Sequence, residues 1–264
     1  MAYELKATSD YLRDREVFLI RIEMSEYLLD YYHQRRELAA STARAHDEKL
    51  KDLIASFAIH LTARTALETH AWTLHIVDEQ PYSLFVTGST GELGEDGIAR
   101  GFLVGHILTE HIRHSDTNAI HAQCINRGKT FRSYVPCESS NIASMVESFY
   151  RQSEQRPIRI KISETSDSAI GLAALPGFES AWFYGVDLDE LAAESEKLDK
   201  TRMRNCHFTF TCDCSPEKLT PFFKTLGAQG LADLYGDDEE LMISCPRCGR
   251  RFAVRRELIE STHD

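Results

Sequence analysis

The sequence predicts an α+β fold in three parts: an N-terminal core of helices with a largely antiparallel sheet, a charged connector, and a small C-terminal domain. Three observations lead to this prediction. Helix-like and strand-like patterns of apolar residues are mixed through the first 180 residues, charged residues crowd the next 30, and two close pairs of cysteines lie in the last 54. The domain boundaries are therefore expected at 1–180, 181–210 and 211–264.

The N-terminal core carries signals for both kinds of secondary structure. Apolar residues recur every three or four positions in residues 26–38 and 46–67, as on the buried face of an amphipathic helix. Short stretches that alternate apolar and polar residues between turn signals predict strands. These stretches are WTLHIV, YSLFV, AIHAQCI, FRSYV and RIKI.

Residues 181–210 are rich in charge and poor in large apolar side chains. Their helix propensity is adequate, but the narrow apolar stripe offers little surface for packing. We therefore expect a weakly held connector. Near its end, Cys206 and His207 offer an extra thiol or an alternative metal ligand, and the favoured interpretation is that Cys206 lies in a strand.

The net charge of −11 is concentrated in the first 200 residues, because residues 201–264 hold nine Lys and Arg against ten Asp and Glu. An acidic surface repels phosphate, so binding to nucleic acid is unfavourable for most of the chain. One basic patch keeps nucleic acid open as a partner at the C-terminal end. It consists of Arg247, Arg250, Arg251, Arg255 and Arg256.

The N-terminal sequence MAYELKATSDYLRDREVF has no apolar signal region, and no stretch approaches the roughly 18 apolar residues of a membrane helix. We therefore expect a cytoplasmic protein with no membrane partner. In a reducing cytosol, its seven cysteines are expected to be metal ligands, redox sensors or packed thiols rather than permanent disulfides.

Four of these cysteines form two pairs about thirty residues apart, Cys212 and Cys214 as C-x-C, and Cys245 and Cys248 as C-x-x-C. Ser215 and Pro216 mark the start of a helix after the first pair, and strands are expected on both sides of the second. Four thiolates from two such pairs can surround one tetrahedral Zn²⁺ at about 2.3 Å each. We expect the four cysteines to be the ligands of one zinc ion.

Zinc in such a module has two alternative roles. It can be structural, in a ribbon that binds a partner or nucleic acid, or it can be a switch, because close thiolates oxidise to disulfides and then release the metal. Structural zinc contributes roughly 10–16 kcal/mol of apparent folding free energy, so its loss would unfold a domain this small. A catalytic zinc is disfavoured because four cysteines close the coordination shell. With no convincing nucleophile and base elsewhere, we expect no enzyme.

Several segments resemble the heat shock protein 33 family. In the C-terminal domain these are CDCSPEKL, TLGAQGLADL and CPRCGRRFAV, and in the core they are YRQSEQRP and SAIGLAALPG. The resemblance covers residues 130–180 and 208–260, whereas before residue 130 only the order of elements agrees. We therefore expect a divergent member of this family.

The resemblance implies a redox-regulated, ATP-independent holdase chaperone. In that family the reduced zinc form is inactive, and oxidation forms disulfides within each cysteine pair, releases zinc, and unfolds the C-terminal domain and the adjoining linker. Cys212, Cys214, Cys245 and Cys248 would then be both metal ligands and redox-active thiols. The implied partners are unfolded client proteins, and the oxidised form is expected either to remain a monomer or to form a homodimer.

Other polar residues are expected to have structural roles. Cys124 and Cys137 are expected to pack as small buried hydrophobes, and Glu154 to fasten a helix-to-strand junction. Residues 88–97 are rich in glycine but lack a phosphate-binding lysine, so we expect a hairpin or loop. Four histidines are expected on helix surfaces or at caps: His106, His111, His114 and His121.

Overall fold

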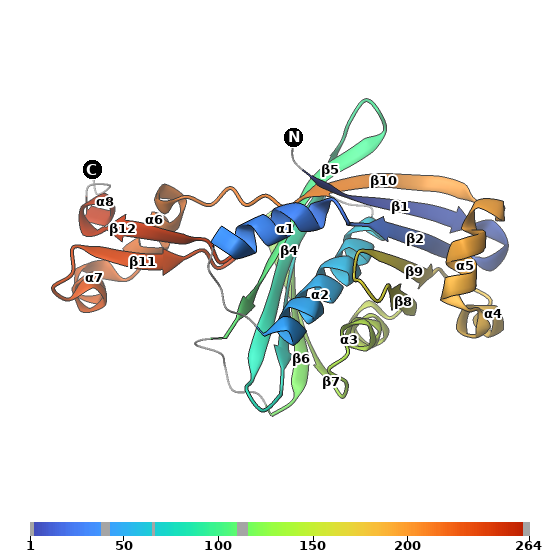
Figure 1. The fold of residues 1–264 in the computed structure, drawn as a ribbon, viewed down its shortest axis with the longest axis horizontal. Helices are drawn as coiled ribbons and strands as arrows, with labels where there is room; N and C mark the ends of the chain where they lie inside the picture. The colour runs from blue at the N-terminus through green and yellow to red at the C-terminus, as the bar shows by residue number, and fades with distance from the viewer. Residues whose placement is uncertain (1–2, 38–42, 65–66, 110–115, 261–264) are drawn as a thin grey trace.

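The computed structural model describes residues 3–37, 43–64, 67–109 and 116–260. Within these ranges the core is a ten-stranded sheet in the order β7-β6-β3-β4-β5-β10-β1-β2-β9-β8 (Figure 1). Neighbouring strands are antiparallel except β10 and β5, which confirms the predicted α+β class with a largely antiparallel sheet. The strands are β1 (Glu4–Leu12), β2 (Val17–Glu23), β3 (Thr69–Ile76), β4 (Tyr82–Leu93), β5 (Ile98–Leu108), β6 (Asn118–Asn126), β7 (Lys129–Cys137), β8 (Ile158–Ile162), β9 (Ser168–Ala174) and β10 (Thr201–Thr209).

The two helices predicted near the N-terminus are confirmed as α1 (Tyr27–Glu37) and α2 (Arg44–Thr62). α2 crosses one face of the sheet (Figure 1) and is apolar along much of its length, as a helix covered on most sides must be. Between β7 and β8 lie α3 (Ile142–Phe149) and the π-helical turn η2 (Tyr150–Glu154), and the short 3-10 turn η1 (Arg13–Arg15) joins β1 to β2.

The β1–β2–β9 half of the sheet is covered on both faces. Because side chains alternate along a strand, Ile20 of β2 packs into the main core with α2, while its neighbour Leu19 packs on the opposite face. That second face is covered by the helices α4 (Ser180–Gly185) and α5 (Leu188–Glu194), followed by the 3-10 turn η3 (Ser195–Lys197). Residues 180–194 are thus packed helices.

The end of the predicted connector is a central strand, which corrects that part of the prediction. β10 lies between β5 and β1 in the middle of the sheet. Cys206 and Phe208 are fully buried in the core, so the prediction that Cys206 lies in a strand is confirmed. The charges that suggested a solvated segment are paired instead, because Arg202 and Lys200 form ion pairs with the buried carboxylate of Asp10.

The glycine-rich residues 88–97 form the end of the β4–β5 hairpin, as predicted. Gly91 has φ +67°, and a Cβ at this position would lie 1.7 Å from the carbonyl oxygen of Arg100. Only glycine fits such a close backbone approach.

The C-terminal module is a two-stranded sheet surrounded by three short helices within the described residues. The side chain of Ser215 accepts a hydrogen bond from the backbone nitrogen of Lys218, and Pro216 opens the first helix, which confirms the predicted helix start. A small apolar core of its own includes Leu231, Tyr235 and Val254. The elements are α6 (Pro216–Lys224), α7 (Gly227–Tyr235), β11 (Glu240–Ser244), β12 (Arg251–Arg255) and α8 (Arg256–Glu260).

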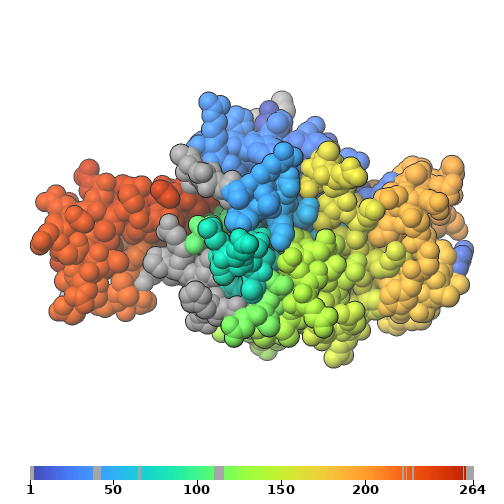
Figure 2. Space-filling model, turned by 60° about the horizontal axis from the view of Figure 1, so that its bottom comes forward, coloured from blue at the N-terminus to red at the C-terminus, as the bar shows by residue number. Residues whose placement is uncertain are grey.

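The molecule is elongated, with the module at one end. Figure 2 shows the module (red) at one end and the α4–α5 region (orange) at the other, with the body of the sheet between them. None of the described helices is both long and apolar enough to cross a lipid bilayer.

Candidate metal centre

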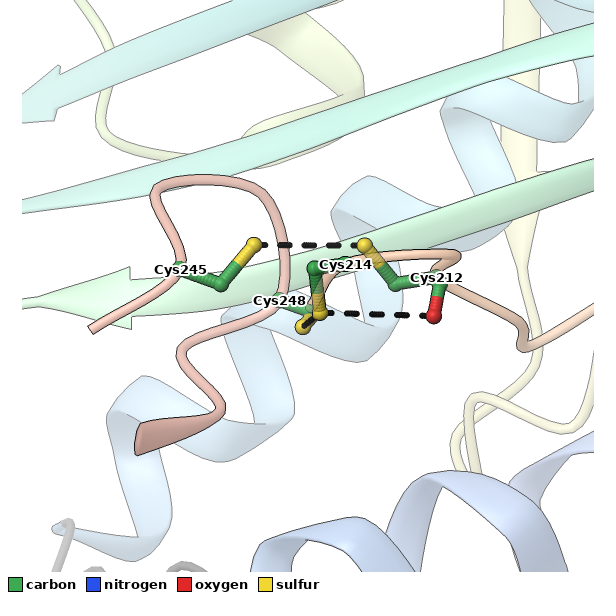
Figure 3. A group of neighbouring side chains, drawn as sticks. All are labelled: Cys212, Cys214, Cys245 and Cys248. Atoms are coloured by element: carbon green, nitrogen blue, oxygen red, sulfur yellow. Dashed lines mark hydrogen bonds between the residues drawn. The ribbon is translucent and has the colours of Figure 1, made fainter. Parts of the chain in front are cut away.

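The structure brings together the four cysteines of the two sequence pairs. Cys212 and Cys214 lie in the segment that joins β10 to α6, and Cys245 and Cys248 lie in the turn between β11 and β12. Their sulfurs all lie within 4.8 Å of one another (Figure 3). The two segments meet face to face, so each contributes half of the cluster.

The spacing of the sulfurs fits a tetrahedral metal. The Sγ atoms of Cys212 and Cys245 are 3.9 Å apart, and those of Cys214 and Cys248 are 3.5 Å apart (Figure 3). Four sulfurs at about 2.3 Å from a central zinc would be about 3.8 Å from each other. The arrangement also leaves all four as free thiols, because a disulfide requires sulfurs at about 2.05 Å.

Local backbone structure holds the second pair in place. The backbone nitrogen of Cys245 donates to the carbonyl of Arg250, and that of Gly249 donates to the carbonyl of Cys245. The backbone nitrogen of Arg247 points at the sulfur of Cys245 at 3.4 Å. Gly249 has φ +75°, the left-handed conformation that glycine adopts without strain. This turn, residues 245–250, is called the knuckle below. It presents the sulfurs of Cys245 and Cys248 on one side and stabilises a thiolate at Cys245.

The closeness of the four thiols shifts their pKa values in opposite directions. Hydrogen bonds from the thiols of Cys212 and Cys248 lower the pKa of Cys245, and the same Cys212–Cys245 contact raises the pKa of Cys212. Burial raises the pKa of Cys214 to about 12. Four thiolates so close together would repel strongly in a poorly solvated site. A divalent cation held by all four sulfurs would remove this conflict, because it would take the place of their protons.

The cysteine knuckle is docked on the core. The side-chain nitrogen of buried Gln34, on α1, donates to the carbonyl oxygen of Cys248 at 2.6 Å. The Nδ1 atom of His106, on β5, lies 3.3 Å from the carbonyl oxygen of Arg247. Burial lowers the pKa of His106, so a neutral ring donates its Nδ1 proton to that carbonyl. Two core elements thus bind the backbone of the metal-site turn.

Apolar contacts extend this docking. Cys245 and Cys248 are almost completely buried and belong to the main core cluster. Phe210 lies two residues before the first cysteine pair and packs edge-on against Tyr27 and Tyr31 of α1. The guanidinium of Arg247 lies 4.8 Å from the ring centre of Phe102. The four-cysteine cluster is therefore also the joint between the module and the core.

The contact between His106 and the module was not predicted from the sequence, because His106 was expected on a helix surface or at a cap. The structure places His106 in β5 and His121 in β6, which corrects that expectation, and His111 and His114 lie outside the described residues. The short apolar runs on both sides of His106, residues 102–104 and 107–108, are typical of a buried strand and could have located it. Nothing local in the sequence links it to residue 247, more than a hundred positions away.

Other predicted residues lie away from the four sulfurs. Cys206 is buried in β10, and Cys137 is buried at the end of β7, as expected for small packed thiols. Cys124 differs from expectation, because it is only half-buried and lies beside a histidine and a glutamate. Glu154 forms an ion pair with Arg64 at 2.5 Å where η2 ends, which supports its predicted role at a helix-to-strand junction.

The basic patch is partly engaged in contacts within the chain. Arg247 lies 3.3 Å from a carboxylate oxygen of Asp213 as well as over Phe102. Arg255 lies 3.7 Å from the carboxylate of Glu240. These contacts reduce the positive charge that the patch can offer to phosphate.

Fold and site together define a class of protein: an α+β sheet domain with a docked four-cysteine module that is able to hold a metal ion. A family profile described as "Hsp33 protein" matches residues 171–255, which include all four cysteines. The 33 kDa chaperonin of Methylobacillus flagellatus is 23% identical over 232 residues, covering 78% of this chain and 78% of that protein. The 33 kDa chaperonin of Hahella chejuensis is 23% identical over 160 residues, covering 52% and 56%.

A solved structure has the same fold. The 33 kDa chaperonin (heat shock protein 33 homolog) of Thermotoga maritima matches with a TM-score of 0.65 and 13% identity, over 99% of this chain and 97% of that chain. The resemblance predicted from the sequence is thereby confirmed: the chain resembles the Hsp33 family at low sequence identity.

Proposed function

We propose that this protein is a redox-regulated, ATP-independent holdase chaperone that protects unfolding proteins from aggregation under oxidative stress. Cys212, Cys214, Cys245 and Cys248 are both the ligands of one Zn²⁺ and the redox-active thiols. The observation that carries the proposal is the position of the four sulfurs, which lie at the joint between module and core. The family resemblance supports a chaperone function.

In the reduced state the C-terminal module is folded and docked on the core. Cys212, Cys214, Cys245 and Cys248 would hold Zn²⁺ through four thiolates, and these bonds would tie the two halves of the module together. Structural zinc of this kind contributes roughly 10–16 kcal/mol of apparent folding free energy. Gln34 and His106 hold the second half of the cluster against α1 and β5. Apolar side chains beneath the knuckle, including Phe102 and Phe210, stay covered.

Oxidation undocks and unfolds the module by forming disulfides within each sequence pair, between Cys212 and Cys214 and between Cys245 and Cys248. Each disulfide forms from two thiolates, whose two electrons reduce one molecule of hydrogen peroxide, and two protons from solvent complete two molecules of water. The sulfur contacts at 3.5 and 3.9 Å run between the pairs, so bonding within the pairs must rearrange both segments. Disulfide sulfurs are poor zinc ligands because the metal binds thiolates. With both pairs oxidised, Cys212, Cys214, Cys245 and Cys248 would no longer hold zinc, and the module would lose its main source of stability.

Release of the knuckle exposes the surface that binds clients. The side chains left uncovered are apolar and aromatic, the kind of patch that associates with unfolded chains. They come from β5 and the end of β10: Phe102, over which Arg247 lies, and Phe210, which shares the core cluster of Cys245 and Cys248. Unfolded client proteins are the partners, and the oxidised form acts as a monomer or a homodimer in the cytoplasm.

The switch is confined to residues from about 211 onward. Only Phe210 and Thr211 separate β10 from Cys212, and β10 is hydrogen-bonded to strands on both sides. Unfolding of α4 and α5 together with the module would require this central strand to leave the sheet. We therefore propose that the segment before β10 stays folded on activation.

Client aggregation, followed by light scattering, tests the proposal. The reduced zinc-loaded protein is compared with peroxide-treated protein, and released zinc is measured in the same samples. We expect suppression of aggregation only after oxidation, together with zinc release. Cys214→Ser should lose the redox response, whereas Cys137→Ala, which removes a buried thiol outside the cluster, should keep it. Zinc release without suppression would refute the chaperone function.

A further inference from the structure

A second group of metal-binding side chains lies in the core, on the β3–β6 strand pair. His70 of β3 is directly opposite Cys124 of β6 in the antiparallel register. Glu68 lies two residues before His70, and residues two apart on an extended chain face the same side. The three side chains therefore converge on one face of the sheet, at the edge of a cavity of about 270 Å³.

The distances within this group are within about half an ångström of those between ligands of one metal. The Nε2 atom of His70 is 3.0 Å from a carboxylate oxygen of Glu68 and 3.8 Å from the sulfur of Cys124. All three ligand atoms lie within 4.8 Å of one another. Around a tetrahedral metal with bonds of about 2.0–2.3 Å, such atoms are about 3.3–3.5 Å apart. We propose that Glu68, His70 and Cys124 form a second metal site, for a divalent transition metal such as Zn²⁺ or Co²⁺.

The side chains behind the ligands orient them. The Nδ1 atom of His70 is 3.1 Å from Nε2 of buried His60, whose Nδ1 is 2.8 Å from the hydroxyl of Tyr150. In the metal-bound form the Nε2 lone pair of His70 would take the metal in place of its hydrogen bond to Glu68, and the proton on Nδ1 would be donated to Nε2 of His60. The second oxygen of Glu68 accepts a hydrogen bond from Asn126 at 2.7 Å. Such outer hydrogen bonds fix the rings and carboxylates of metal sites.

Charge and access also suit a divalent cation. The carboxylate of Glu68 and the thiolate of Cys124 balance the two positive charges. The nearest cationic side chain in the cavity lining, Arg64, is itself paired with Glu154 at 2.5 Å. Three protein ligands leave a fourth position that faces the cavity, where water or a small donor can bind. This open arrangement differs from the closed four-cysteine centre.

The site is independent of the C-terminal switch, because its ligands come from the core. The full-length reduced protein, with one zinc held by the four-cysteine module, is titrated with Co²⁺, and thiolate-to-cobalt absorption is recorded. We expect one further equivalent with the weak visible bands of a single-thiolate tetrahedral site. Cys124→Ala and His70→Ala should abolish this equivalent, and Glu68→Gln should weaken binding. Asn126→Ala should weaken it about 10–100-fold.

Cys137→Ala is the matched control, since it removes a thiol outside both groups and should leave the second equivalent intact. Near-UV circular dichroism of each variant separates loss of metal binding from loss of fold, and Glu68→Gln retains the size of the side chain if the alanine variants unfold. Absence of a second cobalt equivalent in the unmodified protein would overturn the proposal. So would a cobalt–thiolate band that persists in Cys124→Ala.

Discussion

Gln34→Ala is expected to loosen the joint between core and module without touching the metal ligands. Gln34 is 7% exposed and donates to the carbonyl oxygen of Cys248 at 2.6 Å. Alanine removes the donor and leaves this carbonyl without its partner in a largely buried position. The four sulfurs and their backbone segments are unchanged.

The magnitude follows from the cost of an unsatisfied buried acceptor, which is about 1–3 kcal/mol. If that cost falls on the docked state alone, the equilibrium between docked and undocked module shifts by about 5- to 150-fold, because about 1.4 kcal/mol corresponds to a factor of ten. Undocked modules expose their thiols to oxidant. Zinc release should therefore be faster by a similar factor when undocking limits the reaction.

The assay is stopped-flow zinc release under a fixed excess of peroxide, read by a chromogenic chelator. Gln229→Ala is the matched control, since Gln229 is exposed on α7 and its side chain bonds only within the module, to Asp233 at 2.9 Å. We expect faster release in Gln34→Ala and an unchanged rate in Gln229→Ala. Equal rates in both variants and the parent protein would refute the idea that docking on α1 protects the cluster.

Three further predictions concern the ligands, the knuckle and the core. Cys212→Ser should lower bound zinc by one equivalent and unfold the module, as measured by elemental analysis and by loss of amide protection after residue 212, because three thiolates cannot replace the closed shell. Gly249→Ala should speed zinc release, since alanine at φ +75° is strained by about 1–2 kcal/mol and its Cβ would lie 3.3 Å from His106; an unchanged release rate would argue against a tight knuckle. Burial raises the pKa of Glu147, whose carboxylate accepts a hydrogen bond from the backbone of Ile160 at 2.8 Å. The stabilisation that the neutral Glu147 carboxyl gives the folded protein is present below pH 4.5 and is lost as the pH rises through the raised pKa of the folded state. In urea unfolding, the free energy of unfolding of Glu147→Gln should therefore increase relative to that of the parent between pH 4.5 and neutrality; a difference between the two proteins that does not change with pH would contradict this.

Much of the architecture could be predicted from local patterns. The helices α1 and α2 follow from apolar spacing, and the start of α6 follows from the Ser215 cap. The four-cysteine cluster could be predicted because metal coordination dictates both residue type and spacing. These features depend on neighbours in sequence, so periodicity and motif are sufficient to find them.

Features that depend on distant contacts could not be predicted. β10 was expected to be a charged connector, because nothing local indicates that Arg202 and Lys200 pair with Asp10, some 190 residues earlier. The contact between Gln34 and the Cys248 carbonyl spans 214 positions. The Glu68, His70 and Cys124 group was missed for the same reason, since only the pairing of β3 with β6 brings Cys124 opposite His70.

Hydrogen–deuterium exchange of the full-length protein, compared between the reduced zinc-loaded state and the peroxide-treated state, tests the central claim most directly. We expect the amides of α6 to α8 and of β11 and β12 to lose protection after oxidation, and those of α1 and β5 beneath the knuckle to become more exposed. The amides of β10 should keep their protection. A module that stays equally protected in both states, or a β10 that opens together with it, would contradict a switch confined to the four-cysteine module.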